Sequence, residues 1–419
     1  MKAASAVGHR LNTTRLRIVV LGYLVKGPLA GYAWHHLQYV MGLLALGHDV
    51  YFMEDSGDSR SCCYDPSRNI TDADPTYGLT FAACTFGLVG LGDRWTYYDA
   101  HTKQWHGPCA GRVREICATA DLLVNLGQTN VLRPWLADIP VRALVDTDPG
   151  FTQIRLLTEP ERRSRALQHT VFFSFGENIG DARCTVPDAG FSWKPTRQPV
   201  VLDAWPVTLG PPQGSFTTIM QWDSYRPRVH AGQHYGMKSD SFQPFSDLPE
   251  RCPATFEIAL AGGAAPRQEL RAKGWKLRDA LEQTRDLVTY QQYIQRSKGE
   301  FSVAKHGYVV SRSGWFSERS AAYLASGRPV VVQDTGFSSW LPPGAGVMAF
   351  ESPEEALAGV ESIDRRYAFH CRAARETAEE YFDARKVLSR LVELSMNNCP
   401  VETAVEACAQ GAGACREQK

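Results

Sequence analysis

Residues 311–336 read SRSGWFSERSAAYLASGRPVVVQDTG, and this stretch decides the fold. Val309–Ser311 are rich in β-branched residues and predict a strand that leads into a loop of small residues. Ser317–Ser326 are predicted as a helix that Gly327 ends, because serine is a favourable N-cap and glycine a favourable C-terminal residue. Pro329–Gln333 are predicted as the next strand, whose first position tolerates proline. Strand, loop, helix and strand in this order are typical of a parallel α/β sheet.

The same rhythm appears near the N-terminus. Arg17–Gly22 and Asp49–Glu54 predict buried strands, and Trp34–Leu46 between them carries apolar residues at helical spacing. Such a unit forms a parallel strand pair with a right-handed crossover. Further strands are predicted at 121–127, 142–146, 171–176, 216–221 and 256–261, and helices at 353–360 and 364–394. We therefore expect an α/β protein.

Two domains are expected, because 419 residues exceed the roughly 100–200 of one domain. The densest proline and glycine stretch near mid-chain is 203–214, as expected of a linker. The predicted domains are residues 1–205 and 213–395, followed by a flexible tail over 396–419.

The composition argues against several classes of protein. Forty-five Lys and Arg residues balance 45 Asp and Glu residues, so we expect no nucleic-acid partner. No apolar run approaches the roughly 20 residues of a membrane-spanning helix, so no integral membrane segment is expected. The 11 cysteines are scattered and form no C-x-x-C pair, which predicts no metal site and reduced thiols in a cytoplasmic protein. The chain also lacks a G-x-x-x-x-G-K-[ST] loop and a G-x-S-x-G elbow.

The stretch 311–336 offers two ligand-binding features. Free amides at the start of the helix at Ser317 attract phosphate, and the helix dipole adds to the attraction. The polar turn Gln333–Gly336 follows a strand at the edge where open α/β sheets bind ligands. A diphosphate at Ser317 and a sugar at Asp334 fit both features. Any connection from strand to helix also needs small residues, so the pattern by itself leaves both interpretations open.

Three short motifs point to a family. They are Gly314-Trp315-Phe316-Ser317, the turn Gly327-Arg328-Pro329-Val330-Val331, and Leu46-Gly47-His48-Asp49-Val50 after the first helix. They resemble motifs of glycosyltransferases of the GT-B architecture. The resemblance implies two facing Rossmann-like domains with a C-terminal helix. It also implies metal-independent transfer of a sugar from a nucleotide-diphosphate donor to a small-molecule or glycan acceptor, with no cofactor beyond the nucleotide-sugar co-substrate.

The second domain is then expected to bind the donor. The implied donor-binding residues are Lys238, Arg312, Ser313, Gly314, Trp315, Ser317, Glu318, Arg319, Gln333, Asp334, Thr335 and Gly336, with Lys305 as a further cation. Many retaining members of the family hold the ribose with a Glu where this chain has Ala322. Glu318, one helical turn earlier, is the acid that could replace it. The donor base and the stereochemical outcome stay open.

The catalytic candidates come from the first domain, because an inverting transferase needs a base near the acceptor. They are His35 and His36, which open the first helix, and Asp148, which follows a strand; Asp146 and Glu177 lie at similar strand ends. The segment 56–110 is expected to shape the acceptor pocket with its aromatic residues, although these also suit a core: Trp95, Tyr97, Tyr98 and Trp105.

Two other functions fit the same fold. A nucleotide-sugar epimerase would need no acceptor. A non-catalytic carbohydrate-binding protein would explain the missing Glu at Ala322.

Overall fold

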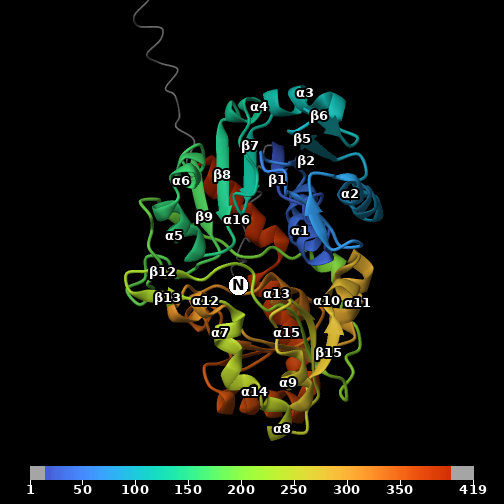
Figure 1. Ribbon diagram of the computed structural model, residues 1–419, viewed down its shortest axis with the longest axis vertical. Helices are drawn as coiled ribbons and strands as arrows, with labels where there is room; N and C mark the ends of the chain where they lie inside the picture. Colours follow the sequence, from blue (N-terminus) through green and yellow to red (C-terminus); the bar gives the residue numbers. More distant parts are fainter. Residues whose placement is uncertain (1–14, 398–419) are drawn as a thin grey trace, which may run out of the picture.

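The computed structural model describes residues 15–397, which form two α/β domains that face each other (Figure 1). A cavity lies between the two domains. The tail predicted over 396–419 lies outside the described residues, except for its first two positions. No helix in the described part of the chain is long and apolar enough to cross a membrane.

The first domain is built on an eight-stranded sheet in the order β10-β9-β8-β7-β1-β2-β5-β6, parallel except where β6 pairs with β5. Its strands are β1 (Arg17–Leu21), β2 (Asp49–Asp55), β5 (Trp95–Asp99), β6 (Gln104–His106), β7 (Leu122–Leu126), β8 (Val141–Asp146), β9 (Val171–Ser174) and β10 (Trp193–Pro195). Both faces are buried: Ile18 and Val20 join one core, and Val19 and Leu21 join another. This alternation explains why β1 is apolar along its whole length.

The second domain has a six-stranded sheet, parallel throughout, in the order β15-β14-β11-β16-β17-β18. Its strands are β11 (Phe216–Gln221), β14 (Phe256–Ala261), β15 (Lys276–Asp279), β16 (Gly299–Ser302), β17 (Val330–Gln333) and β18 (Val347–Phe350). Val330 and Val332 face the core that the two domains share, and Val331 faces the other side.

Helices cover the two sheets, and two hairpins extend from them. In the first domain they are α1 (Ala30–Ala45), α2 (Thr76–Leu88), α3 (Val113–Ala118), α4 (Pro134–Ala137), α5 (Phe151–Thr158) and α6 (Pro160–Ala166). In the second they are α7 (Lys238–Phe242), α8 (Leu248–Arg251), α9 (Arg267–Ala272), α10 (Ala280–Thr284), α11 (Leu287–Gln295), α12 (His306–Val310), α13 (Glu318–Ala325), α14 (Pro353–Arg365) and α15 (Tyr367–Tyr381). The hairpins are β3 (Cys63–Asp65) with β4 (Ile70–Asp72), and β12 (Arg228–His230) with β13 (Gln233–Tyr235).

The described part of the chain ends on the first domain. Its last helix, α16 (Ala384–Met396), packs against α1 at Gly42, where a Cβ would lie 2.5 Å from Leu388 and 2.9 Å from Ala384. A short bridge between Val200 and Asp383 anchors the return. The sequence predicted one helical region over 364–394. The structure breaks it at Arg366, where α14 ends, and again at Phe382, after which α16 crosses to the first domain.

One predicted strand is wrong. Val309–Ser311 belong to the short helix α12 and its end, and the strand that precedes the loop is β16. The reason is tertiary: Tyr308 packs beside Phe151 of the first domain, and the Ser311 hydroxyl donates to the Gly307 carbonyl at 2.6 Å. These contacts favour a helical turn over the strand preference of two valines.

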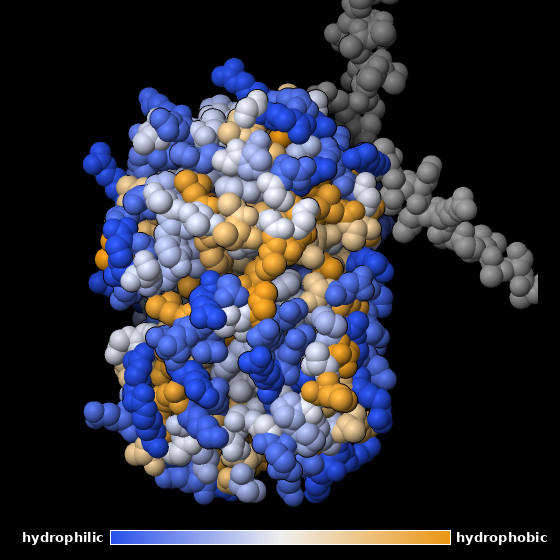
Figure 2. Space-filling view, turned by 90° about the vertical axis from the view of Figure 1, so that its right-hand side faces the viewer, coloured by the Kyte–Doolittle hydropathy of each residue, from blue (hydrophilic) through white to orange (hydrophobic). Residues whose placement is uncertain are grey.

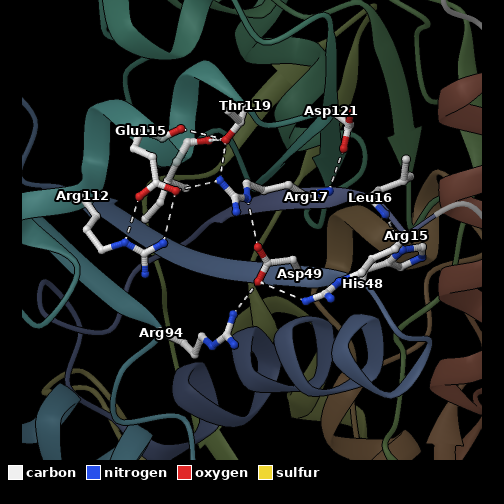
Figure 3. A network of polar contacts seen from close by, with 11 residues as sticks. Arg15, Leu16, Arg17, His48, Asp49, Arg94, Arg112, Glu115, Thr119 and Asp121 are labelled. Carbon is white, nitrogen blue, oxygen red and sulfur yellow. Dashed lines mark hydrogen bonds and ion pairs between the residues drawn. The ribbon is translucent and has the colours of Figure 1, made fainter.

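A charged network closes the amino ends of the first-domain strands (Figure 3). Asp49 accepts from Arg17 at 2.9 Å and from Arg94 at 2.6 Å, and Asp121 accepts from the Arg17 amide at 2.7 Å. Ligands of open α/β sheets bind at the carboxyl ends of the strands. This network therefore belongs to the scaffold and not to the site.

Apolar side chains also reach the surface of the first domain. Figure 2 shows them gathered on the side of the molecule where α2 lies in Figure 1, and Leu88 at the end of that helix is 60% exposed.

Candidate functional site

The candidate site is a cavity of about 1040 Å³ between the two domains, at the carboxyl ends of both parallel sheets. Its volume reaches the upper end of the roughly 300–1,000 Å³ typical of small-molecule sites, so it has room for two substrates. Its position agrees with the rule that open parallel sheets bind ligands beyond their strand ends.

A buried carboxylate shapes the first-domain wall. Glu54, at the end of β2, accepts the backbone amides of Leu24 at 2.6 Å and of Val25 and Lys26 at 2.8 Å each. Burial raises the pKa of Glu54, against the pull of the Lys26 charge and the three amides. The loop between β1 and α1 is thereby fixed, and with it the cavity-lining Tyr23.

The two predicted histidines lie at the cavity, but their surroundings differ. His36 is fully buried; its Nδ1 donates to the Tyr32 carbonyl at 2.6 Å, and its Nε2 accepts from the Tyr23 amide at 3.2 Å. Both ring nitrogens are therefore occupied in one neutral tautomer. Burial, and then the neighbouring His35, lowers the pKa of His36 well below its usual value. His36 thus supports the loop and has no nitrogen left for a substrate.

His35 is the histidine that remains available. It is half-buried, lines the cavity and has no ring hydrogen bond to any described residue. Burial lowers its pKa, and the charge of Glu318 in the other domain partly opposes that shift. His35 is consequently neutral at pH 7, the form that accepts a proton.

Asp148, the third predicted catalytic residue, is engaged in a contact between the domains. Its carboxylate accepts from Lys305 Nζ at 2.9 Å and from the hydroxyls of Tyr225 and Tyr308, all of the second domain. Burial would raise the pKa of Asp148, but Lys305 and the two hydroxyls bring it below its usual value. Asp148 is therefore ionised and links the two domains. Both of its carboxylate oxygens already accept hydrogen bonds, so neither is free for proton transfer.

The start of α13 forms part of the second-domain wall. Ser317 caps this helix by accepting the Arg319 amide at 3.2 Å, as the sequence predicts. Trp315, Ser317, Glu318 and Arg319 all line the cavity. Glu318 is exposed and forms no ion pair with any described residue.

The side chain of Arg319 is fixed by three hydrogen bonds within the second domain. Its guanidinium donates to buried Glu300 at 2.7 Å, to the Ile219 carbonyl at 2.8 Å and to the Ser302 hydroxyl at 2.8 Å. Burial lowers the pKa of Arg319, but Glu300 together with Tyr290 and Tyr323 outweighs burial, so the net pKa is above its usual value. Arg319 therefore supplies charge to the cavity floor from a fixed position.

Lys238, at the start of α7, lines the cavity without an ion-pair partner among the described residues. Burial, and then the charge of Arg319, lowers the pKa of Lys238 to about 7. An anion in the cavity would provide the counter-charge that this lysine lacks.

Seven predicted donor residues do not reach this cavity: Arg312, Ser313, Gly314, Gln333, Asp334, Thr335 and Gly336. Their two segments pair with each other, since the Gly314 amide donates to the Thr335 carbonyl at 2.9 Å. Asn178 of the first domain donates to the carbonyls of Arg312 at 3.0 Å and Gly336 at 2.9 Å. The first domain thus covers the turn that was expected to hold the sugar.

The side chains of these segments are also occupied or turned away. Asp334 accepts the Gly336 amide at 2.8 Å, and Gln333 accepts the Ala304 amide at 3.1 Å. Arg312 pairs with Glu351 at 3.5 Å on the surface.

The aromatic residues predicted to shape an acceptor pocket lie elsewhere. Trp95 and Tyr97 are buried in the first-domain core, and Tyr98 packs with Trp105 and Trp135. The segment 56–110 reaches the cavity through its β3–β4 hairpin instead, with Tyr64 and Asn69. No repetition or motif marks these two residues in the sequence.

Sequence reasoning also missed the part of the cavity beyond β14 and β15. Gly262, Gly263, Arg267, Asp279 and Leu281 line it. They belong to no recognisable motif, but they lie at the carboxyl ends of β14 and β15 or in the segments that follow these strands, which is the signal that could have found them.

No group of three or more His, Cys, Asp or Glu residues is placed to hold a metal ion within residues 15–397.

The whole arrangement resembles several solved structures. An alpha-glucosyltransferase in complex with UDP-glucose and DNA containing an abasic site matches with a TM-score of 0.55 and 10% identity, over 91% of this chain and 100% of that one. The chain has the GT-B fold. HepE from Anabaena, in complex with UDP-glucose, matches at 0.53 and 14% identity, over 91% of this chain and 100% of that one. AviGT4, a glycosyltransferase involved in avilamycin A biosynthesis, matches at 0.51 and 12%, over 91% and 97%. No protein-family model and no curated protein sequence matches the chain.

These likenesses confirm the predicted fold class and correct one prediction about partners. A GT-B protein of similar structure is described in complex with DNA. The expectation of no nucleic-acid partner was therefore wrong in its reasoning, because a neutral net charge over the whole chain does not exclude such a partner for this fold.

Proposed function

We propose that this protein is a glycosyltransferase that moves a sugar from a nucleotide-diphosphate donor to an acceptor held by the first domain. The observation that carries the proposal is Lys238, a cation without an ion-pair partner among the described residues, in an interdomain cavity beside the start of α13. The described GT-B neighbours in complex with UDP-glucose support the nature of the donor.

The second domain would hold the donor diphosphate. Lys238 supplies the mobile positive charge, and the amides at the start of α13 supply further donors. Arg319 strengthens the field from its fixed position against Glu300. The negative charge that develops on the leaving diphosphate is then neutralised by protein groups, without a metal and without a further cofactor.

His35 would be the catalytic base. It faces the cavity from the first domain and is neutral at pH 7, so it can accept the proton of an acceptor hydroxyl. This role applies to an inverting reaction. In a retaining reaction the leaving diphosphate itself accepts the proton, and the loss of His35 has little effect on the chemical step.

The first test is a thermal-shift screen against UDP, GDP, dTDP, ADP and CMP. A ligand at 100 times its Kd stabilises the folded protein by about 2.7 kcal/mol, which is readily measured. One diphosphate is expected to stand out, and the effect should weaken in Lys238→Met. Arg312→Asn is the matched control, because it removes an exposed cation outside the cavity and asparagine tolerates the positive φ of 49° there.

The second test supplies the matching sugar nucleotide. Release of the nucleoside diphosphate, with the sugar passed to water or to an added acceptor, is the expected result. Isomerisation of the sugar nucleotide without release would indicate an epimerase. No stabilisation by any diphosphate would overturn the proposal.

A further inference from the structure

The cations of the cavity fall into two groups. Six line it: Arg155, Arg162, Lys238, Arg267, Lys305 and Arg319. Four of them are paired with carboxylates, Arg155 and Lys305 with Asp148, Arg162 with Glu159, and Arg319 with Glu300. Within the described residues, Lys238 and Arg267 are left without a carboxylate. Lys238 is accounted for by the proposed diphosphate, and Arg267 is not.

Arg267 is fixed by backbone carbonyls and not by charge. It is the first residue of α9 and is half-buried. One terminal nitrogen of its guanidinium donates to the Gly262 carbonyl at 2.7 Å, and the other approaches the Leu260 carbonyl at 3.4 Å. Both terminal nitrogens are therefore turned toward the end of β14, which leaves the flat face of the group as its main surface for a ligand.

The surroundings of Arg267 form an open and largely apolar recess. Gly263 carries no side chain, and a Cβ built there would meet no atom within 4 Å. Ala280 and Leu281 line the recess at the start of α10. Asp279 caps this helix by accepting the Leu281 amide at 2.9 Å through one oxygen, which leaves its other oxygen at the rim.

We propose that Arg267 stacks its guanidinium on the nucleobase of the donor, so that the recess around it is the nucleoside end of the site. This inference rests on the proposed function, since it assigns the part of the donor that Lys238 does not bind. A flat ring with polar edges suits a recess of small and apolar residues. Arginine stacks well on such rings because its guanidinium is planar and weakly hydrated.

Phosphate is the competing ligand for an unpaired arginine. Arginine binds phosphate through two parallel N–H donors of one edge. In this structure each terminal nitrogen spends one N–H on a carbonyl group, so the edge between these two nitrogens is occupied and only the edge that includes Nε keeps two free donors. The apolar neighbours Ala280 and Leu281 then favour a base over a phosphate.

The test separates the two ends of the donor. UDP, GDP, ADP and dTDP are titrated first, and the tightest of them is compared with inorganic pyrophosphate, a probe that has no base. In Arg267→Ala we expect about 5- to 30-fold weaker binding of the nucleoside diphosphate and unchanged binding of pyrophosphate. In Lys238→Met we expect both to weaken. Arg267→Lys keeps the charge but not the plane, so it should not restore binding. Arg271→Ala, on an exposed position of the same helix, is the matched control.

Each other outcome overturns the inference. Equal loss of pyrophosphate and nucleoside diphosphate in Arg267→Ala would show that the guanidinium holds a phosphate. Full rescue by Arg267→Lys would show that charge alone matters. Wild-type affinity in Arg267→Ala would remove the residue from the site and leave the proposed function intact. Failure of the unaltered protein to bind any of the four diphosphates would overturn the proposed function together with this inference.

Discussion

Replacing Asp148 by asparagine should loosen the contact between the two domains. The substitution keeps the size of the side chain but removes its charge, and it leaves Lys305 without its partner. Tyr225 and Tyr308 lose a charged acceptor and keep a neutral one. The remaining partner of Asp148, Arg155 of the first domain, lies farther away at 3.7 Å. Because the three closer partners come from the second domain, the loss acts mainly on the way the domains close.

The magnitude follows from burial. Breaking a fully buried ion pair costs about 3–5 kcal/mol, and an exposed pair contributes about 0–1 kcal/mol. The side chains of Asp148 and Lys305 are 20% and 16% exposed, which is closer to the buried case. We therefore expect Asp148→Asn to cost about 2–3 kcal/mol, or roughly 30- to 150-fold in the equilibrium between the closed and the open arrangement.

Two measurements check this prediction. Small-angle scattering should show a larger radius of gyration for Asp148→Asn, and urea unfolding should begin at a lower concentration. Asp181→Asn is the matched control, because Asp181 pairs with Arg183 at 3.3 Å on the surface and should cost less than about 0.5 kcal/mol. Identical scattering and unfolding of the two variants would refute the reasoning.

The contact of Asp148 with Lys305 and the two tyrosines also makes the stability of the protein depend on pH. The pKa of Asp148 is lower in the folded protein than its usual value, because Lys305 and the tyrosine hydroxyls outweigh burial. Its contribution to stability is therefore complete above the unfolded pKa of about 3.9 and is lost as pH falls through the lower folded pKa. Asp148→Asn should differ from the unaltered protein at pH 6 and converge with it in acid.

Three further predictions concern the site and its frame. The affinity for a nucleoside diphosphate should fall as pH rises above about 7, because Lys238 with a pKa of about 7 must be protonated to bind it. Calorimetry in two buffers of different ionisation enthalpy should detect proton uptake on binding. Lys238→Met should abolish this dependence of the affinity on pH. Glu54→Gln should destabilise the protein by about 1–3 kcal/mol in urea, since an amide group replaces one carboxylate oxygen that accepts backbone amides. Gly42→Ala should cost about 1–3 kcal/mol by pushing α16 from α1. Because Leu388 is the side chain it meets, Gly42→Ala combined with Leu388→Ala should cost less than the sum of the two single substitutions in the same assay.

The fold could be predicted because strongly patterned segments carry their own signal. The strands β1 and β17 are continuous apolar runs closed by glycine or polar turns, and α13 has both a serine cap and a terminal glycine. The helix α12 could not be predicted, because its two valines favour a strand and only the packing of Tyr308 against the other domain favours a helix.

The candidate site, too, has residues that a local motif predicts and residues whose place depends on the other domain. Ser317 and Trp315 follow from a local motif and do line the cavity. The turn Gln333–Gly336 follows from the same motif but is covered by Asn178, a residue 155 positions before the turn in the chain. No local pattern indicates a contact between residues so far apart in the sequence. The motif could therefore predict that the start of α13 lines the cavity, but not that the first domain covers the turn Gln333–Gly336.

The positions of the charges explain why the net charge of the whole chain was a poor guide to its binding partners. Equal numbers of acidic and basic residues say nothing about where unpaired charges lie. In the cavity most cations are matched by carboxylates that fix the scaffold, and the unmatched Lys238 and Arg267 both belong to the second domain. An anionic donor is therefore expected on that side whatever the acceptor is, and the identity of the acceptor must be read from the first-domain wall around Tyr23, His35 and Tyr64.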